Sequence, residues 1–323
     1  MSSPRNASVS LLSVVVPLFN EEDVLPILRT RLAQVLGGLD CTWEVVLVDD
    51  GSTDRTMELI RQFAREDPRY RGVLLSRNHG HQLALTAGLD HSHGDAVVVI
   101  DADLQDPPEL IPEMIARWSQ GYDVVFAQRI SRESDTVMKR ATAHAFYWLV
   151  RWLSKVDIPQ NVGDFRLMDR KVVEALRRMP ERFRFVRGMV AWVGFRQCAI
   201  TFERAARAAG TTKYPWRKMI SFALDAIFSF SVSPLRAATL LGVLTTLASA
   251  AAVLWTVYLR FVMNTTIPGY SALIVAVLLL GGLNLTLLGI VGEYVGRIYV
   301  EVKQRPLYLV SELITAETEA KRV

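Results

Sequence analysis

Cysteine is scarce in this chain of 323 residues, where only Cys41 and Cys198 occur. They are far apart and fit no Cys-x-x-Cys spacing, which excludes a disulfide scaffold and a cysteine-based metal or redox motif. We therefore expect reduced, cytosol-facing thiols. Disorder is excluded as well, because 50% of the residues are hydrophobic and the formal net charge is only +4.

Four widespread catalytic signatures are also missing. The chain has no Gly-x-Gly-x-x-Gly after a strand, no Gly-x-x-x-x-Gly-Lys-Ser/Thr, no Gly-x-Ser-x-Gly and no His-Glu-x-x-His. Dinucleotide enzymes, P-loop NTPases, serine hydrolases and zincins are therefore disfavoured. His79 and His81 alternate as zinc ligands sometimes do, and so do His91 and His93. No cysteine or glutamate ligand set accompanies them, so we do not expect zinc.

Charge is absent from two long stretches near the C-terminus, residues 237–259 and 261–292. Each exceeds the roughly 20 residues that cross a bilayer, whereas buried core helices rarely stay uncharged beyond about 14 residues. They also account for a mean hydropathy of +0.21, which is high for a soluble domain with 22% charged residues. We predict two membrane-spanning helices at about 235–260 and 269–293, joined into a hairpin.

Basic residues flank this predicted hairpin mainly on its outer sides, and only Arg260 lies near the connector. The outer residues are Arg217, Lys218, Arg236, Arg297, Lys303 and Arg305. Since basic flanks stay in the cytoplasm, we predict an inner- or plasma-membrane protein with two spans and both termini cytoplasmic. Segments 139–155 and 214–233 mix aromatic and basic residues, which favours helices in the membrane interface over ordinary surface helices.

The first part of the chain alternates between apolar β-branched runs and helix-like segments. We expect strands at 11–17, 43–48, 72–75, 96–100 and 123–127, and helices at 23–36, 53–66, 82–91 and 108–119. This alternation predicts an α/β fold with a mostly parallel sheet covered on both faces. Ligands of such sheets bind beyond the carboxyl ends of the strands. The polar clusters of the sequence fall at those ends.

Acidic residues form the clearest of these clusters. Alternation predicts that Asp101 and Asp103 lie on one side of an extended segment that Gln105 continues. Such oxygen ligands suit Mg²⁺ or Mn²⁺, which bridge to phosphates. The plainer alternative is helix capping by Asp106 ahead of two prolines. The pair Asp49-Asp50 at the end of the second strand favours the metal hypothesis.

Two basic clusters point to anionic ligands. Arg77 follows the third strand and would either neutralise a diphosphate or form a surface ion pair of little energetic value. The loop 204–214 contains arginine, threonine and lysine side chains suited to clamping a phosphate or attracting anionic headgroups. The segment GDFRLM at 163–168 is a further polar motif.

Taken in order, these motifs resemble a known family. They are VVPLFNEE at 15–22, VDDGSTD at 48–54, SRNHG at 76–80, DADLQDPPE at 101–109, GDFRLM at 163–168 and RAAGTTKY at 207–214. The chain is similar over nearly its whole length to the polyprenyl-phosphate glycosyltransferases of glycosyltransferase family 2, which include dolichyl-phosphate mannose synthases and bacterial undecaprenyl-phosphate glucosyltransferases. The resemblance implies a Rossmann-like type A glycosyltransferase domain at 1–213, an interfacial helix at 214–233, the hairpin within 234–300 and a cytoplasmic tail at 301–323.

The resemblance also implies an activity. It is the inverting, metal-dependent transfer of a hexose from a nucleotide sugar, by association UDP-glucose, to polyprenyl (undecaprenyl) phosphate at the cytoplasmic membrane face. A GDP-mannose-dependent mannose synthase is the alternative within the family, and a non-catalytic membrane scaffold or a lipid-linked sugar flippase is the alternative outside it. The implied cofactor is Mg²⁺ or Mn²⁺. The implied partners are the donor, the acceptor and membrane lipid, with no nucleic acid and a homo-oligomer left open.

Site residues follow from the same resemblance. Donor binding is expected at Pro17, Phe19, Glu21, Asp49, Asp50, Arg77, Asp101, Ala102 and Gln105, and metal binding at Asp101, Asp103 and Gln105. Acceptor phosphate binding is expected at Arg129, Arg140, Arg207, Thr212 and Lys213, and catalytic roles fall to Asp164, Asp103 and Arg207. Asp164 is interpreted either as a base or as a positioning residue. Thr212 departs from the serine that is frequent in the family.

Overall fold

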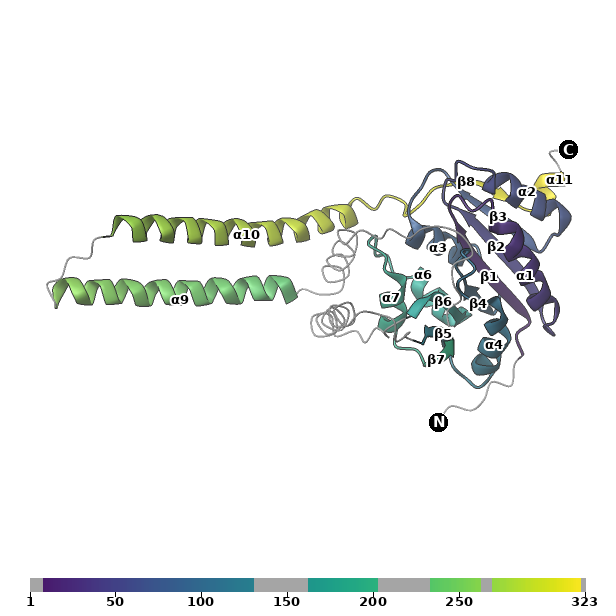
Figure 1. The fold of residues 1–323 in the computed structure, drawn as a ribbon, viewed down its shortest axis with the longest axis horizontal. Coiled ribbons are helices and arrows are strands. Elements are labelled where there is room, and N and C mark those ends of the chain that lie inside the picture. Colours follow the sequence, from purple (N-terminus) through teal and green to yellow (C-terminus); the bar gives the residue numbers. More distant parts are fainter. Residues whose placement is uncertain (1–7, 131–161, 203–232, 263–268, 321–323) are drawn as a thin grey trace. The chain divides into compact units, whose positions relative to one another are not determined.

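The computed structural model describes residues 8–130, 162–202, 233–262 and 269–320, which fall into two compact units. One unit holds an eight-stranded sheet and the helices that cover it, and the other holds two long helices (Figure 1). The predicted α/β class with a mostly parallel sheet and two long apolar C-terminal helices is confirmed.

The sheet brings together strands that are distant in the chain. In spatial order they are β7 (Gln197–Phe202), β5 (Val124–Arg129), β6 (Val162–Asp169), β4 (Ala96–Val99), β1 (Leu11–Leu18), β2 (Thr42–Asp49), β3 (Tyr70–Leu75) and β8 (Val310–Ile314). The central strands β4, β1, β2 and β3 run parallel. Strand β6 lies antiparallel between β4 and β5, and β8 lies antiparallel along β3. The five predicted strands are all present.

Helices alternate with these strands as the sequence predicts. They are α1 (Leu25–Gly37), α2 (Thr56–Glu66), α3 (His81–Asp90), a short 3₁₀ turn η1 (Pro108–Leu110) with α4 (Ile111–Ser119), α6 (Arg170–Arg177) and α7 (Val186–Trp192). Val14 and Val16 of β1 pack in the core that contains buried side chains of α1, α2 and α4. Val15 points to the other face, where a Cβ on Gly88 of α3 would lie only 2.2 Å from it. Both faces of the central sheet are therefore covered, as its predominantly apolar strands require.

The C-terminal tail contributes to the first unit, which the sequence analysis did not anticipate. Strand β8 pairs with β3, the amide of Ser76 donates to the Leu309 carbonyl at 2.8 Å, and helix α11 (Ala316–Ala320) follows. Glu319 of α11 is only 1% exposed and forms ion pairs with Arg65 and Arg61 of α2. Strand β8, which is five residues long, covers the edge of the sheet that β3 would otherwise expose.

The second unit contains α9 (Ser233–Phe261) and α10 (Tyr270–Val302). Both contain a window long and apolar enough to cross a membrane, at Leu235–Ala252 and Leu279–Val302. Leu254 and Phe261 expose 71% and 80% of their surface in the isolated chain. Within this unit, side chains from α9 and α10 line one shared hollow, so the helices pack against each other. The predicted interfacial segment 139–155 and nearly all of 214–233 lie outside the described residues.

Candidate active site

A cavity of about 320 Å³ opens at the carboxyl ends of β1, β2 and β4. Of the residues predicted from the sequence to act in donor binding or catalysis, Pro17, Phe19, Glu21, Asp50, Asp101, Ala102 and Asp103 line it. Three more lining residues are Asn78 and Gly80 from the loop between β3 and α3, and His81, the first residue of α3. The topology thus gathers segments as far apart in the chain as Pro17 and Asp103, because parallel strands end at the same edge.

Hydrogen bonds from backbone amides to side-chain oxygens fix the loops after β1 and β2 to each other. Asn20, which has a positive φ of 55°, donates from its amide to the Ser52 hydroxyl and accepts from the Thr53 amide at 2.8 Å. The amide of Glu22 donates to Asp54, and the carboxylate of Glu22 accepts from the Arg55 amide. These reciprocal contacts join the two loops that supply Phe19, Glu21 and Asp50 to the cavity.

The acidic pair at the end of β2 has a structural role that the sequence left open. Asp50 accepts hydrogen bonds from the amides of His79 and Gly80, at 2.7 and 2.9 Å. Asp49 accepts from the Ser52 amide at 3.3 Å, and burial raises the pKa of Asp49. Asp49 is 3% exposed and is not among the residues lining the cavity. Asp50, the second carboxylate of the pair, therefore links the loops that follow β2 and β3.

Arg77 does not reach the cavity. Its side chain is exposed and donates to the Asn78 carbonyl at 3.1 Å. The backbone of Arg77 nevertheless matters, because Gly51 packs against it with a φ of +73°, and a Cβ there would lie 2.6 Å from the Arg77 carbonyl carbon. Only glycine fits both this backbone conformation and this close approach.

The segment after β4 turns instead of continuing extended, which corrects one expectation. Strand β4 ends at Val99, and Leu104 adopts a positive φ of 58° between Asp103 and Gln105. Asp101 and Asp103 both line the cavity, whereas Gln105 is 4% exposed and does not. A leucine in the left-handed region costs of order 1–3 kcal/mol, so the surrounding structure must enforce this turn. The turn, not strand alternation, brings the two aspartates together.

Two buried oxygens in this turn have no hydrogen-bond partner, Asp101 Oδ1 and Gln105 Oε1. Burial, with the charges of Asp164, Asp106 and Asp103, raises the pKa of Asp101 to about 6 against the opposing effect of His81. Burial and then the charges of Asp103, Asp54 and Asp101 raise the pKa of Glu21. The buried oxygens of Asp101 and Gln105 that accept no hydrogen bond, beside the carboxylate of Asp103, suit a divalent cation, so these three residues fit Mg²⁺ or Mn²⁺ by donor chemistry.

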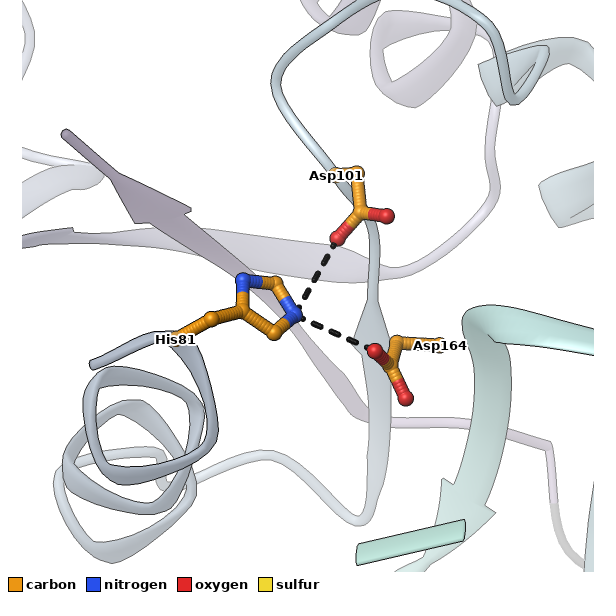
Figure 2. Close-up of side chains that lie close together, drawn as sticks. All are labelled: His81, Asp101 and Asp164. Carbon is orange, nitrogen blue, oxygen red and sulfur yellow. Dashed lines mark hydrogen bonds and ion pairs between the residues drawn. The ribbon is translucent and has the colours of Figure 1, made fainter. Parts of the chain in front are cut away.

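Strand β6 brings Asp164 to the same place. Its antiparallel register with β4 pairs Ala96 with Asp169 and Val99 with Arg166. Beyond the end of β4, a carboxylate oxygen of Asp164 lies within 4.8 Å of one of Asp101. His81, the first residue of α3, lies between these carboxylates, with Nε2 3.1 Å from Asp164 and 3.6 Å from Asp101 (Figure 2). The GDFRLM motif is therefore a buried strand whose polar end faces the acidic turn.

Asp164 is fully engaged by its neighbours. Arg187 of α7 donates Nε to one carboxylate oxygen at 2.8 Å and Nη2 to the other at 2.9 Å. Burial opposes ionisation of Asp164, but the hydrogen bonds from His81 and Arg187 outweigh it and hold its pKa well below the usual range. Burial would lower the pKa of His81, and the hydrogen bond to Asp164 raises it instead. His81, Asp101 and Asp164 lie close enough to hold an ion, but Arg187 already occupies both oxygens of Asp164.

The predicted acceptor residues are described only in part. Arg129 at the end of β5 donates to the buried Asp106 at 3.3 Å, and its Nε is buried without a hydrogen-bond partner. Gly163 leaves room for this arginine, because a Cβ there would lie 3.0 Å from Nη2. Arg140, Arg207, Thr212 and Lys213 lie outside the described residues.

Sequence reasoning missed the supporting residues of this site. His81 was considered only as a zinc ligand, and Arg187 was not singled out, since a lone arginine in a short helix has no local signal. Arg166 is also buried and donates to the Gly163 carbonyl at 2.9 Å, and burial lowers its pKa to about 10. The position of Arg166 inside GDFRLM was the one available hint.

Comparisons with known proteins agree with this arrangement. The family model "Glycosyl transferase family 2" matches residues 13–177. An uncharacterized glycosyltransferase of Synechocystis sp. is 48% identical over 302 residues, which cover 94% of this chain and 95% of that protein. The SfII prophage-derived bactoprenol glucosyl transferase of Shigella flexneri is 42% identical over 301 residues, covering 93% and 97%.

A solved structure, glucosyl-3-phosphoglycerate synthase from Mycobacterium tuberculosis in complex with Mn²⁺, UDP and phosphoglyceric acid, aligns with a TM-score of 0.46 at 19% identity. It covers 68% of this chain and 76% of that chain. The family model and the sequence identities over most of the chain decide the family. The chain belongs to glycosyltransferase family 2.

Proposed function

We propose that this chain transfers glucose from UDP-glucose to a polyprenyl phosphate, with inversion at the anomeric carbon. The observation that carries the proposal is the cavity at the strand ends, where Phe19 and Pro17 meet Asp101 and Asp103. Relatives of 42% identity that are named bactoprenol glucosyl transferases supply the substrate classes. Bactoprenol is a polyprenyl lipid whose phosphate is the acceptor in this proposal.

The cavity suits a nucleotide sugar chemically. Phe19 is 46% exposed, which offers an aromatic face to a base beside Pro17, and Glu21 offers a hydrogen-bond acceptor. The acidic turn would repel a bare diphosphate, so the donor must arrive with a cation. Mg²⁺ or Mn²⁺, held by Asp101, Asp103 and Gln105, offsets the negative charge of the diphosphate leaving group when it is bound.

The acceptor needs little help from a base. A phosphate monoester with a second pKa near about 6 is largely ionised at neutral pH and is already nucleophilic. Asp164, whose two oxygens are occupied by Arg187 and His81, is a poor proton acceptor in any case. We therefore assign Asp164 a positioning role and propose that Arg129, with the loop residues Arg140, Arg207, Thr212 and Lys213, receives the acceptor phosphate.

Chain connectivity supports the proposed membrane topology. Strand β8 follows α10 and pairs with β3, so β7, which precedes the hairpin in the chain, and β8, which follows it, belong to the same compact unit. If the two helices span the bilayer, both ends of the hairpin lie on one side. The basic flanks favour the cytoplasm for that side. We propose a catalytic domain at 1–213 with the C-terminal strand added to it, an interfacial segment at 214–233 and the membrane hairpin within 234–300.

A donor and acceptor panel tests this proposal. The purified full chain is incubated with polyprenyl phosphate, Mg²⁺ or Mn²⁺, and UDP-glucose, UDP-galactose, UDP-N-acetylglucosamine or GDP-mannose labelled in the sugar. We expect label to enter the organic phase with UDP-glucose and only when lipid phosphate is present. Preferred use of GDP-mannose would identify a mannose synthase. No transfer from any donor would favour a scaffold or flippase and overturn the proposal.

A further inference from the structure

Arg187 lies beyond the part of the chain that the family model matches, yet it makes the closest contacts to Asp164. The fork of its guanidinium binds both carboxylate oxygens, at 2.8 and 2.9 Å. Asp164 is 2% exposed, and Arg187 retains 31% of its side-chain surface. A bidentate pair of this kind fixes the carboxylate in orientation as well as position. Arg187 therefore determines where Asp164 presents its remaining acceptor capacity.

The remaining acceptor capacity of Asp164 is directed to His81, the first residue of α3. The Oδ2 atom of Asp164, which faces Nη2 of Arg187, also lies 3.1 Å from Nε2 of His81 (Figure 2). His81 lines the cavity, and the same Nε2 atom is 3.6 Å from Asp101. A chain of polar contacts thus runs from Arg187 through Asp164 and His81 to the acidic turn.

Helix α7 is itself held against α3, so Arg187 has a fixed base. The amide of Val186 donates to Gln82 Oε1 at 2.9 Å, and Gln82 is the residue after His81. Arg184 donates to the Thr86 hydroxyl at 3.4 Å and to the carbonyls of Leu176 and Met179. The start of α7 is therefore fixed to the helix whose first residue lines the cavity.

We propose that Arg187 is a positioning residue of the transfer reaction, which holds Asp164 so that His81 keeps its place in the cavity wall. The inference rests on the proposed glucosyl transfer and adds to it a residue that lies outside the six motifs quoted above and outside the residues that the family model matches. Arg187 does not line the cavity, and its bidentate contact goes to Asp164, so its effect on the cavity passes through that carboxylate. Without the fork, the carboxylate of Asp164 keeps only longer contacts, to His81 at 3.1 Å, Gln82 at 3.5 Å and Arg166 at 3.9 Å, so its orientation toward His81 is less firmly fixed.

A double-mutant cycle tests this role. We measure kcat and the KM for UDP-glucose in Arg187→Gln, Asp164→Asn and the double variant. We expect Arg187→Gln to lower kcat by about 10- to 100-fold, as misplaced catalytic geometry does, with KM changed less than about threefold. The double variant should be no slower than Asp164→Asn alone, because residues that act as one unit are not additive. Arg187→Lys should fall between wild type and Arg187→Gln, since an ammonium cannot bridge both oxygens.

Controls separate positioning from folding. Arg178→Gln changes an exposed arginine at the end of α6 and should leave kcat unchanged. Thermal unfolding of Arg187→Gln should shift to lower temperature and recover in the double variant, in which the buried carboxylate is also removed. Wild-type kcat in Arg187→Gln, or multiplicative losses in the double variant, would overturn the inference while glucosyl transfer stands. A wild-type chain without any transfer would overturn both.

Discussion

The carboxylate of Asp50 accepts a hydrogen bond from the backbone amide of His79 at 2.7 Å. Its second oxygen accepts from the Gly80 amide at 2.9 Å, directly before α3 begins at His81. One acidic side chain at the end of β2 thus fixes the loop that delivers His81 to the cavity. Asp50 itself also lines that cavity, so its structural and ligand-facing roles coincide.

Replacing Asp50 should therefore destabilise the protein as well as slow it. In Asp50→Ala two amides lose their acceptor, and we expect unfolding free energy to fall by about 1–3 kcal/mol. Asp50→Asn keeps one oxygen and should lose less. The exposed Asp40 provides the matched control, because Asp40→Ala should stay within about 0.5 kcal/mol of wild type. Chemical or thermal unfolding in detergent measures the difference, and equal stability of Asp50→Ala and Asp40→Ala would contradict the assignment.

Gly51 offers a test of the loop packing. Gly51→Ala forces a Cβ to within 2.6 Å of the Arg77 backbone at a φ of +73°, so we expect a loss of about 1–3 kcal/mol and weaker binding of nucleotide. Gly37→Ala is the control, since a Cβ there meets nothing within 4 Å. Calorimetric titration with UDP compares the two variants. Unchanged nucleotide affinity in Gly51→Ala would show that the β2 and β3 loops do not shape the donor cavity.

The C-terminal strand should be held by Glu319. Its carboxylate, 1% exposed, binds Arg65 at 2.6 Å and Arg61 at 3.4 Å. Glu319→Gln should therefore lower stability by roughly 1–3 kcal/mol and expose the tail to protease. Glu317 of the same helix is exposed, and Glu317→Gln should behave as wild type. Limited proteolysis followed by mass spectrometry detects release of the tail, and identical cleavage of both variants would contradict the proposed anchor.

Part of the loss of stability at acidic pH should come from Glu44, which lies near the amino end of β2, away from the cavity at the carboxyl ends of the strands. Burial would raise the pKa of Glu44, but hydrogen bonds from Ser13, His93 and Arg71 lower it below its ordinary value of 4.5. A lowered folded-state pKa contributes stability above pH 4.5, which is lost as the pH falls through the folded-state value. Glu44→Gln should flatten this part of the stability profile. Parallel profiles for both proteins below pH 4.5 would contradict the assignment.

How far the sequence predicts this structure depends on whether the signal is local. The strands that supply Pro17 and Asp50 are short apolar runs bounded by turn residues, and their parallel alignment follows from the intervening helices. The cavity-lining positions follow from that topology. The five strands and four helices before residue 130 are accordingly present close to their predicted positions.

Features that depend on distant pairing could not be predicted in the same way. Asp164 meets Asp101 because β6 inserts antiparallel between β4 and β5, and no local pattern specifies that register. Leu104 adopts a left-handed conformation that its side chain disfavours. The prediction of an extended segment here, made from strand alternation, was therefore wrong. Arg187 and strand β8 act only through tertiary contacts.

The most direct test of the central claim is the identity of the product made from UDP-glucose and undecaprenyl phosphate by the full chain with Mg²⁺ or Mn²⁺. Proton and phosphorus NMR of the extracted lipid measure the linkage, and chromatography of the aqueous phase measures UDP. We predict a β-linked glucosyl phosphate lipid and UDP in equal amounts, with both abolished by chelator and by Asp103→Asn. An α-linked product, UDP without glycolipid, or undiminished transfer by Asp103→Asn would contradict the account.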